Sequence, residues 1–315
     1  MYNYFLKKLY KLILFIYFCL YNMSYSIDQF AKITGISKLV LRTWENRYNY
    51  LKANRTKTNL RSYSDELLIQ ALKTKFLIDS GYKISFIVSK NDIELDSLMR
   101  ELKDSANDEM SMEYYINKII ESGLKYNVKL FNKTYDECLL DFNHVDFYIQ
   151  ILLPTFSRIG LFWLINRMNP AQEHFLSEMF KQKIYSEIDK IKIPHSKKNT
   201  WLLFLPPNEY HEMGLLFAKF LLLKNGFNVL YLGANVPLDS LQKISEIKEI
   251  NNLLFFSVSN FSKINLIKNI TFLRKYFKKT NKYLVSNSID QNELLKKHQI
   301  TLINDIQKFI KLIST

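Results

Sequence analysis

Apolar positions near the N-terminus recur at helical intervals and predict two short helices joined by a tight turn. Ser26 and Gln29 form a capping-box pattern at the start of the first helix, which is expected to end at Gly35. Ser37 is expected to cap the second helix. The apolar face of the first helix is expected to comprise Ile27, Phe30, Ala31 and Ile33. In the second helix the expected inward residues are Leu39, Val40 and Trp44, and the expected outward residues are Lys38, Arg42, Glu45 and Arg47. Together these elements predict a helix-turn-helix.

Further helices are predicted up to about residue 195. Ser64 can cap a helix that runs to Ser80, and Gly81 suits its C-terminal cap. Residues 91–110 are rich in acidic and small polar side chains and predict a short helix followed by a linker at 96–110. From 111 to 195 glycine is nearly absent and apolar residues recur at helical spacing, which predicts a small helical bundle.

After Thr200 the pattern changes to short β-type runs that alternate with helical segments. The predicted strands are Trp201–Leu205, Val229–Leu232, Leu253–Ser257 and Tyr283–Val285. The predicted helices begin near His211, Leu238, Lys263 and Gln291. This alternation predicts a parallel, doubly wound sheet at 198–315, whose ligands bind beyond the carboxyl ends of the strands. The expected fold is therefore multidomain, with a helix-turn-helix at 23–95, the linker, the bundle at 111–195 and the α/β domain.

Charge adds a candidate partner. The 315 residues contain 44 Lys and Arg against 30 Asp and Glu, a net charge of +14, which favours a polyanion or a membrane surface as partner. Between Phe30 and Arg61 there are eight Lys or Arg and one acid, so the local net charge is 8 − 1 = +7. Such a concentration suits the neutralisation of duplex phosphates.

The first 22 residues form a separate segment. Leu12–Leu20 is an apolar run behind three lysines, but it is too short to span a bilayer and no small-residue cleavage site follows it. We expect translation to start at Met23, with residues 1–22 an upstream extension. Cys19 and Cys138 stand in no metal-ligand spacing, and a reducing, cytoplasmic location is expected. No membrane partner is expected, because the apolar run is too short to span a bilayer.

One run of residues resembles a known DNA-binding module. Arg42-x-Trp44-Glu45-x-Arg47-Tyr48, followed by Arg55 and by Arg61-x-Tyr63-Ser64, closely resembles the winged helix-turn-helix of the MerR family over residues 24–95. The resemblance implies that the second helix enters the major groove and that the wing contacts phosphates. The implied DNA contacts are Lys38, Arg42, Arg47, Arg55, Arg61 and Tyr63, whereas Trp44 belongs to the core. It also implies a homodimer or homotetramer on a two-fold symmetric operator.

A second motif lies after the first predicted strand of the α/β domain. Glu209-x-His211-x-x-Gly214 resembles the base-off cobalamin-binding motif, and Gly233 lies in a loop that is also similar to that family. The resemblance implies a flavodoxin-like, Rossmann-type cobalamin-binding domain with the bundle as its helical cap. The family's Ser-x-Leu and Gly-Gly correspond here to Ser257-Val258-Ser259 and Ser286-Asn287-Ser288.

The bundle carries a further cluster, Trp163 followed by Glu173-His174. The same cluster occurs in light-sensing, cobalamin-dependent regulators related to MerR, and the resemblance implies adenosylcobalamin as cofactor. By this resemblance His211 is the lower axial ligand of cobalt, Trp163 shields the cobalt–adenosyl bond, and His174 can take the upper axial position after photolysis. The implied cofactor-binding residues are Trp163, Glu173, His174, Glu209, His211, Gly214, Gly233 and Ser257.

Three functions fit these patterns. The leading one is a MerR-type transcription regulator, a repressor, with a cobalamin-dependent and light-responsive sensor. The second keeps the DNA binding without the ligand, because side chains at Asn287 and Ser288 would crowd the nucleotide tail of cobalamin. The third is a corrinoid carrier protein, which would not need the helix-turn-helix. No nucleophile–base pair, phosphate loop or carboxylate pair stands at a convincing spacing, so an enzyme is not expected.

Overall fold

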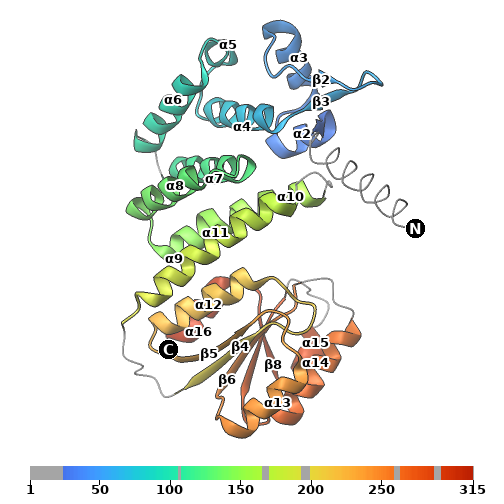
Figure 1. Cartoon of the computed structure of the whole chain (residues 1–315), viewed down its shortest axis with the longest axis vertical. Coiled ribbons are helices and arrows are strands. Elements are labelled where there is room, and N and C mark those ends of the chain that lie inside the picture. The colour runs from blue at the N-terminus through green and yellow to red at the C-terminus, as the bar shows by residue number, and fades with distance from the viewer. Residues whose placement is uncertain are drawn as a thin grey trace, which may run out of the picture. The chain divides into compact units, whose positions relative to one another are not determined.

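The computed structural model describes residues 24–105, 108–164, 170–192, 199–258, 263–286 and 292–314. The chain divides into two compact units, Met1–Leu176 and Ser177–Thr315, whose elements are labelled in Figure 1. The expected upstream extension at 1–22 lies outside the described residues.

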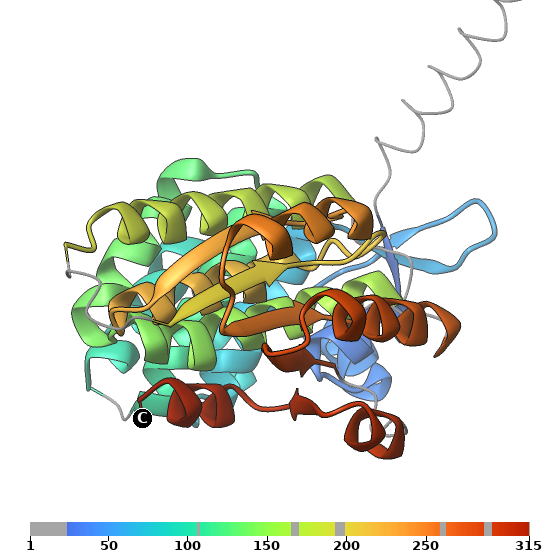
Figure 2. The ribbon, with the colours of Figure 1, turned by 90° about the horizontal axis from the view of Figure 1, so that it is seen from below.

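The N-terminal unit begins with a winged helix-turn-helix. Its elements are β1 (Tyr25–Ser26), α2 (Ile27–Thr34), α3 (Lys38–Tyr48), β2 (Asn54–Arg55), β3 (Arg61–Tyr63) and α4 (Asp65–Asp79). The predicted caps are confirmed: Ser26 and Gln29 form the capping box, Gly35 has φ +69° at the end of α2, and Ser37 caps α3. The three strands form an antiparallel sheet in the order β1-β3-β2. The hairpin between β2 and β3, here called the wing, projects from its domain in both views (Figures 1 and 2).

Helix α3 is rotated relative to the prediction. Leu41 and Trp44, three residues apart, are buried, whereas Leu39 is 75 % exposed and Val40 is also exposed. The prediction that Leu39 and Val40 face inward was therefore wrong. The run Leu39-Val40-Leu41 is apolar throughout, so its pattern alone does not fix which residue meets the core.

Helices make up the rest of the N-terminal unit, as predicted. They are α5 (Ile84–Ile87), α6 (Asp92–Ser105), α7 (Asp108–Leu124), α8 (Val128–Asp141), α9 (His144–Asp146), the π-helix η1 (Phe147–Leu152), α10 (Leu153–Leu164) and α11 (Pro170–Asp189), the last of which continues into the second unit. Most of the predicted linker belongs to α6 instead. Leu95 and Met99, one turn apart, are buried, and Asp96 is neutralised by lysines of two other helices, which explains how so acidic a segment forms a packed helix.

The C-terminal unit is the predicted doubly wound α/β domain. Its elements are β4 (Thr200–Phe204), α12 (Glu212–Lys224), β5 (Asn228–Gly233), α13 (Leu238–Ile247), β6 (Asn252–Phe256), α14 (Lys263–Tyr276), β7 (Asn281–Val285), α15 (Asn292–Lys297), β8 (Ile300–Ile303) and α16 (Ile306–Ser314). All strand pairs are parallel, in the order β5-β4-β6-β7-β8, which is the flavodoxin-like order. The sequence pattern missed β8 and α16.

Both faces of the central strands are buried. Leu202 and Phe204 of β4 pack in one core with α13 and α14. Trp201, on the opposite face, contacts the rings of Tyr283 and Phe309. Burial on both faces explains why the strands read as continuous apolar runs. The carboxyl ends of these strands carry the loops with the predicted site residues.

Candidate functional site

The outward face of α3 is basic. Lys38, Arg42 and Arg47 are all exposed, and Lys38 Nζ lies 2.5 Å from Asp28 Oδ1. The guanidinium of Arg47 lies 5.3 Å from the ring centroid of Tyr48, which keeps it along the helix surface. These three predicted DNA contacts are therefore presented on one accessible helix.

Glu45 does not face outward as predicted. Its side chain is nearly buried, because Arg61 Nε donates to Glu45 Oε2 at 2.6 Å and Arg55 Nη2 lies 3.9 Å from Glu45 Oε1. Two predicted wing contacts thus pair with the carboxylate of the helix. The pairing fixes the wing against α3. A local sequence pattern could not reveal it, because Arg61 lies sixteen positions after Glu45.

Tyr63 is a core residue in this structure. Its ring is fully buried and stacks on Phe30 with centroids 4.1 Å apart. Burial raises the pKa of the Tyr63 phenol, and its hydroxyl has no hydrogen-bond partner among the described residues. A buried ring cannot reach a phosphate without leaving the core, so the position of Tyr63 argues against the direct contact that was predicted.

The wing keeps exposed cations at its tip. Arg55 and Lys57 are exposed, and Arg55 Nη1 donates to Asn59 O at 3.3 Å across the hairpin. Thr56 N donates to Leu60 O and Asn59 has φ +61°, which closes the loop tightly. Lys57 was counted in the basic segment but not among the predicted contacts.

In the α/β domain the predicted Glu209-x-His211 motif is brought together as a pair. His211 Nδ1 lies 2.5 Å from Glu209 Oε1, and His211 is exposed whereas Glu209 is fully buried. Glu209 Oε1 also accepts from the backbone amides of Tyr210 and His211, and Oε2 accepts from Val258 N at 2.9 Å. A carboxylate held in this way orients the imidazole and leaves Nε2 as the nitrogen that can bind a metal.

The loops around this pair are closely packed. Gly233 ends β5 with φ +77°, and a Cβ on it would lie 3.0 Å from Glu212 Oε1. That carboxylate accepts from the Tyr231 hydroxyl at 2.9 Å and pairs with Lys181 at 3.2 Å. Gly214 lies in the first turn of α12. Glu212, Lys181 and Tyr231 were not predicted from the sequence, because only the fold brings them beside the motif.

The third strand contributes a loop that touches Glu209. Ser257, which follows β6, donates its backbone N–H to Val285 O at 2.9 Å, and the next residue supplies the amide that holds Glu209. The predicted Ser257 position therefore borders the site. Ser259, Asn287 and Ser288, where this chain departs from the cobalamin motif, lie outside the described residues.

The second predicted glutamate–histidine pair is looser. His174 Nδ1 lies 3.5 Å from Glu173 Oε2 on α11, and the side chains are 74 % and 30 % exposed. Trp163 is part of α10, but its side chain lies outside the described residues. His174 is thus largely exposed on α11, at a longer distance from its carboxylate neighbour than His211 is from Glu209.

The residues present fit a cobalamin with histidine as its lower ligand. Such a ligand needs one accessible imidazole in a strand-to-helix loop, and the buried carboxylate behind His211 supplies the matching orientation. Gly233 keeps side-chain bulk out of the neighbouring loop.

Of the helices the structure describes, none combines the length and apolar character needed to cross a bilayer.

Two family models match parts of the N-terminal half of the chain, and two repressors are similar to a larger part of it. Residues 25–88 match the MerR HTH family regulatory protein model and residues 115–186 match a B12 binding domain. The HTH-type transcriptional repressor CarH of Myxococcus xanthus is 26 % identical over 221 residues, covering 69 % of this chain and 73 % of the repressor. The repressor CarA of the same organism is 23 % identical, covering 70 % and 72 %.

A solved structure adds support for the fold. The monomethylamine corrinoid protein of Methanosarcina barkeri superposes with a TM-score of 0.54 at 12 % identity, covering 63 % of this chain and 96 % of that protein. At this identity the likeness shows a shared fold alone.

Proposed function

We propose that this homologue of CarH and CarA, which joins a MerR HTH domain to a B12 binding domain, is a cytoplasmic transcription repressor whose operator binding depends on adenosylcobalamin and light. The observation that carries the proposal is the Glu209–His211 pair, a prearranged metal ligand in the same chain as a basic winged helix-turn-helix.

DNA binding rests on the exposed cations of α3 and the wing. Lys38, Arg42 and Arg47 lie on the side of α3 that faces the major groove, and Arg55 contacts the flanking phosphates. Arg61 acts by holding the wing through Glu45 rather than by reading DNA. Replacement of Arg42 by Ala is expected to weaken operator binding without unfolding the protein.

Cofactor binding rests on the loops of the α/β domain. His211 would hold the cobalt through Nε2, Glu209 would fix the orientation of the imidazole ring, and Gly233 and Ser257 lie in the neighbouring loops. Adenosylcobalamin, when bound, supplies a cobalt–carbon bond that light can break. By the resemblance to light-sensing regulators, Trp163 would protect that bond, and His174, with Glu173 beside it, would bind the cobalt once the bond is broken.

The repressor is further proposed to act as a homodimer or homotetramer. Two copies of a helix-turn-helix match two half-sites of a two-fold symmetric operator, and the linked pair binds the operator more tightly than either copy binds its half-site. A light-dependent change of assembly would therefore change operator occupancy without altering a single DNA contact.

One sequence feature favours an alternative function. Asn287 and Ser288 replace the paired glycines of the cobalamin motif, so a regulator that represses without cobalamin is the second candidate. A corrinoid carrier has less support, since it has no use for the basic wing and recognition helix.

A spectrum of the full chain tests the proposal. The protein is mixed with adenosylcobalamin in the dark, desalted, and recorded before and after illumination, beside His211→Ala. We expect retained corrin with a histidine-ligated spectrum that changes on illumination, and loss of that ligation in the variant. A colourless wild-type protein that still binds duplex DNA with steep salt dependence would favour the cobalamin-independent regulator.

A further inference from the structure

The exposed face of α3 carries a stripe of four residues, of which the charge pattern singled out only Arg42. Leu39, Arg42, Thr43 and Asn46 follow the spacing i, i+3, i+4 and i+7, which places them on one side of a helix. All four are exposed, and Leu39 is among the most exposed large apolar side chains described. The opposite face is buried through Leu41 and Trp44, so the stripe is the side of α3 left for a partner.

The chemistry of this stripe matches base edges in the major groove. An arginine fork suits O6 and N7 of guanine, an asparagine amide suits N6 and N7 of adenine, and an apolar group suits the C5-methyl of thymine. Thr43 is already engaged, since its hydroxyl donates to Leu39 O at 2.9 Å. The three remaining side chains each correspond to a different base.

Charge selects DNA over a protein as the occupant of this face. Lys38 and Arg47 flank the stripe and are exposed, whereas the one acid of α3, Glu45, is turned away and paired with Arg61. The cations on either side of the leucine favour a polyanionic partner over a neutral protein surface. A polyanion that carries methyl groups satisfies both kinds of side chain.

We propose that Leu39, Arg42 and Asn46 determine operator sequence, with Leu39 packing on a thymine methyl, Arg42 on guanine and Asn46 on adenine. This inference rests on the proposed DNA binding, but not on cobalamin. Seven residues of helix rise about 10 Å, and base pairs are stacked about 3.4 Å apart, so the three contacts span about three base-pair steps. Each half-site therefore has a core of about four base pairs.

Removal of the thymine methyl tests this directly. Duplexes are enriched from a random-sequence library by the full chain, with and without adenosylcobalamin in the dark, and the winning duplex is remade with deoxyuridine in place of thymidine. Loss of one buried methyl is expected to weaken wild-type binding about three- to fourfold. Leu39→Ala should bind the thymidine duplex more weakly by at least that factor and show no further loss with deoxyuridine.

Val40→Ala is the matched control, because Val40 is also exposed and apolar but lies off the stripe. It should keep the full deoxyuridine penalty, and Asn46→Ala should relax the selection of adenine at one position. An unchanged deoxyuridine penalty in Leu39→Ala, or none in the wild type, would overturn the proposal while leaving DNA binding intact. Failure to enrich any sequence in either condition would overturn both it and the proposed DNA binding.

A different observation concerns helix α4, which is held at two places by polar contacts that include the buried side chains of Tyr25, Gln172 and Lys73. Near its start, Asp65 accepts from the Tyr25 hydroxyl at 2.6 Å and from Gln172 Nε2 at 3.1 Å. Gln172 is 2 % exposed and also donates to Leu124 O. Tyr25 belongs to β1, which pairs with wing strand β3, and Gln172 directly precedes Glu173 and His174 on α11.

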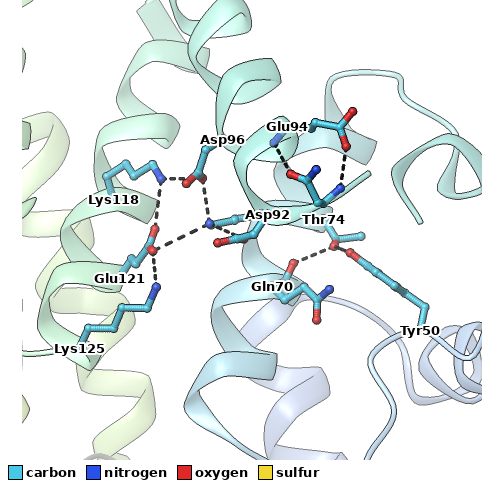
Figure 3. A network of polar contacts seen from close by, with 11 residues as sticks. Tyr50, Gln70, Thr74, Asp92, Glu94, Asp96, Lys118, Glu121 and Lys125 are labelled. Carbon is cyan, nitrogen blue, oxygen red and sulfur yellow. Dashed lines mark hydrogen bonds and ion pairs between the residues drawn. The ribbon is translucent and has the colours of Figure 1, made fainter. Parts of the chain in front are cut away.

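The second contact lies two turns further along α4 (Figure 3). Lys73, almost fully buried, pairs with Asp92 at 2.7 Å and with Asp96 at 2.8 Å, and Glu121 of α7 lies 3.9 Å away. The neighbouring Thr74 bonds to the hydroxyl of Tyr50, the second residue after α3. Helix α4 is thus tied on one side to the wing and recognition helix and on the other to residues within the matched B12 domain.

We infer that the Tyr25–Asp65–Gln172 contact couples α11 to the wing, so that a displacement of α11 changes how the wing is held. Buried polar contacts suit this role because a lost partner is costly, which makes the two ends move together. Only the biological purpose of this coupling depends on the proposed cobalamin sensing. The coupling itself does not require the cofactor.

Hydrogen exchange of the full chain without cofactor tests the coupling. Gln172→Met keeps the length of the side chain and removes its donor; Gln182→Met, at an exposed position of the same helix, is the control. We expect the amides of β1 and β3 to exchange at least about threefold faster in Gln172→Met and at the wild-type rate in Gln182→Met. Unchanged wing exchange in a folded Gln172→Met protein would overturn the coupling, whatever cobalamin does.

Discussion

The two glutamate–histidine pairs of this chain are built differently. In the α/β domain Glu209 is fully buried, lies 2.5 Å from His211 and accepts three backbone amides. On α11 Glu173 is partly exposed, lies 3.5 Å from His174 and adjoins it in sequence. The two side chains of the first pair are held in close contact, whereas those of the second lie farther apart and His174 is largely exposed.

This difference is consistent with the different roles proposed for the two histidines. A ring already oriented by a buried carboxylate loses little freedom on binding, so His211 is suited to a permanent ligand. His174 must be ordered at the moment it binds, which suits a ligand used only after the upper position has been vacated. The resemblance to light-sensing regulators predicted both residues, but only the structure shows that His211 is held more closely by its glutamate than His174 is.

Breaking the buried carboxylate should have the largest effect. Glu209→Gln keeps the size of the side chain but faces three amide donors with one oxygen and an NH₂ group. Cobalamin affinity, measured by equilibrium dialysis in the dark, is expected to fall about 10- to 100-fold. Glu173→Gln is the matched control and should change dark affinity by less than about threefold, because exposed pairs contribute little. Equal losses in both variants would contradict the distinction between the pairs.

A smaller effect is expected from the loop that packs beside the buried pair. Gly233→Ala introduces a Cβ 3.0 Å from Glu212 Oε1 at φ +77°. The α/β domain should lose about 1–2 kcal/mol of unfolding free energy, because a non-glycine residue is strained in that conformation. Urea unfolding measures this.

Gly160→Ala in α10 serves as the opposite case, since nothing lies within 4 Å of its added Cβ. In a helix interior it should stabilise by about 0.5–1 kcal/mol. A Gly233→Ala protein as stable as the wild type would show that the loop has more room than its geometry indicates.

The smallest effect in the dark should come from His174→Ala. Its side chain is 74 % exposed and lies 3.5 Å from the Glu173 carboxylate, so dark cobalamin affinity and dark DNA affinity should stay within about twofold of wild type. The spectrum after illumination should nevertheless differ from that of the illuminated wild type. Identical spectra after illumination would remove His174 from the upper position.

Local chemistry made much of the fold predictable. The caps at Ser26, Ser37 and Ser64 involve residues three apart, so the sequence displays both partners. The parallel sheet was predictable from its apolar runs. Strand β8 was missed because its four residues include the exposed Thr301 and follow a short helix, which leaves a weak pattern.

What the sequence could not reveal depends on distant partners. Glu45 was expected outside because charges usually are, but Arg61 lies sixteen positions away and only the wing brings the two together. The acidic segment around Asp96 was expected to be a linker, but Lys73 of α4 and Lys118 of α7 pair with Asp96 and neutralise its charge within a packed helix. Leu39 and Leu41 are chemically alike, and only packing decides that one meets the core and the other the solvent.

The most direct test of the central claim is the affinity of the full chain for one selected duplex, measured with adenosylcobalamin in the dark, after illumination, and without cofactor. The account predicts tight binding only in the dark, cobalamin-bound state, with affinity lost on illumination and weak binding without cofactor. Equal affinity in all three conditions would contradict a cobalamin-dependent repressor and leave a DNA-binding protein that represses without this ligand.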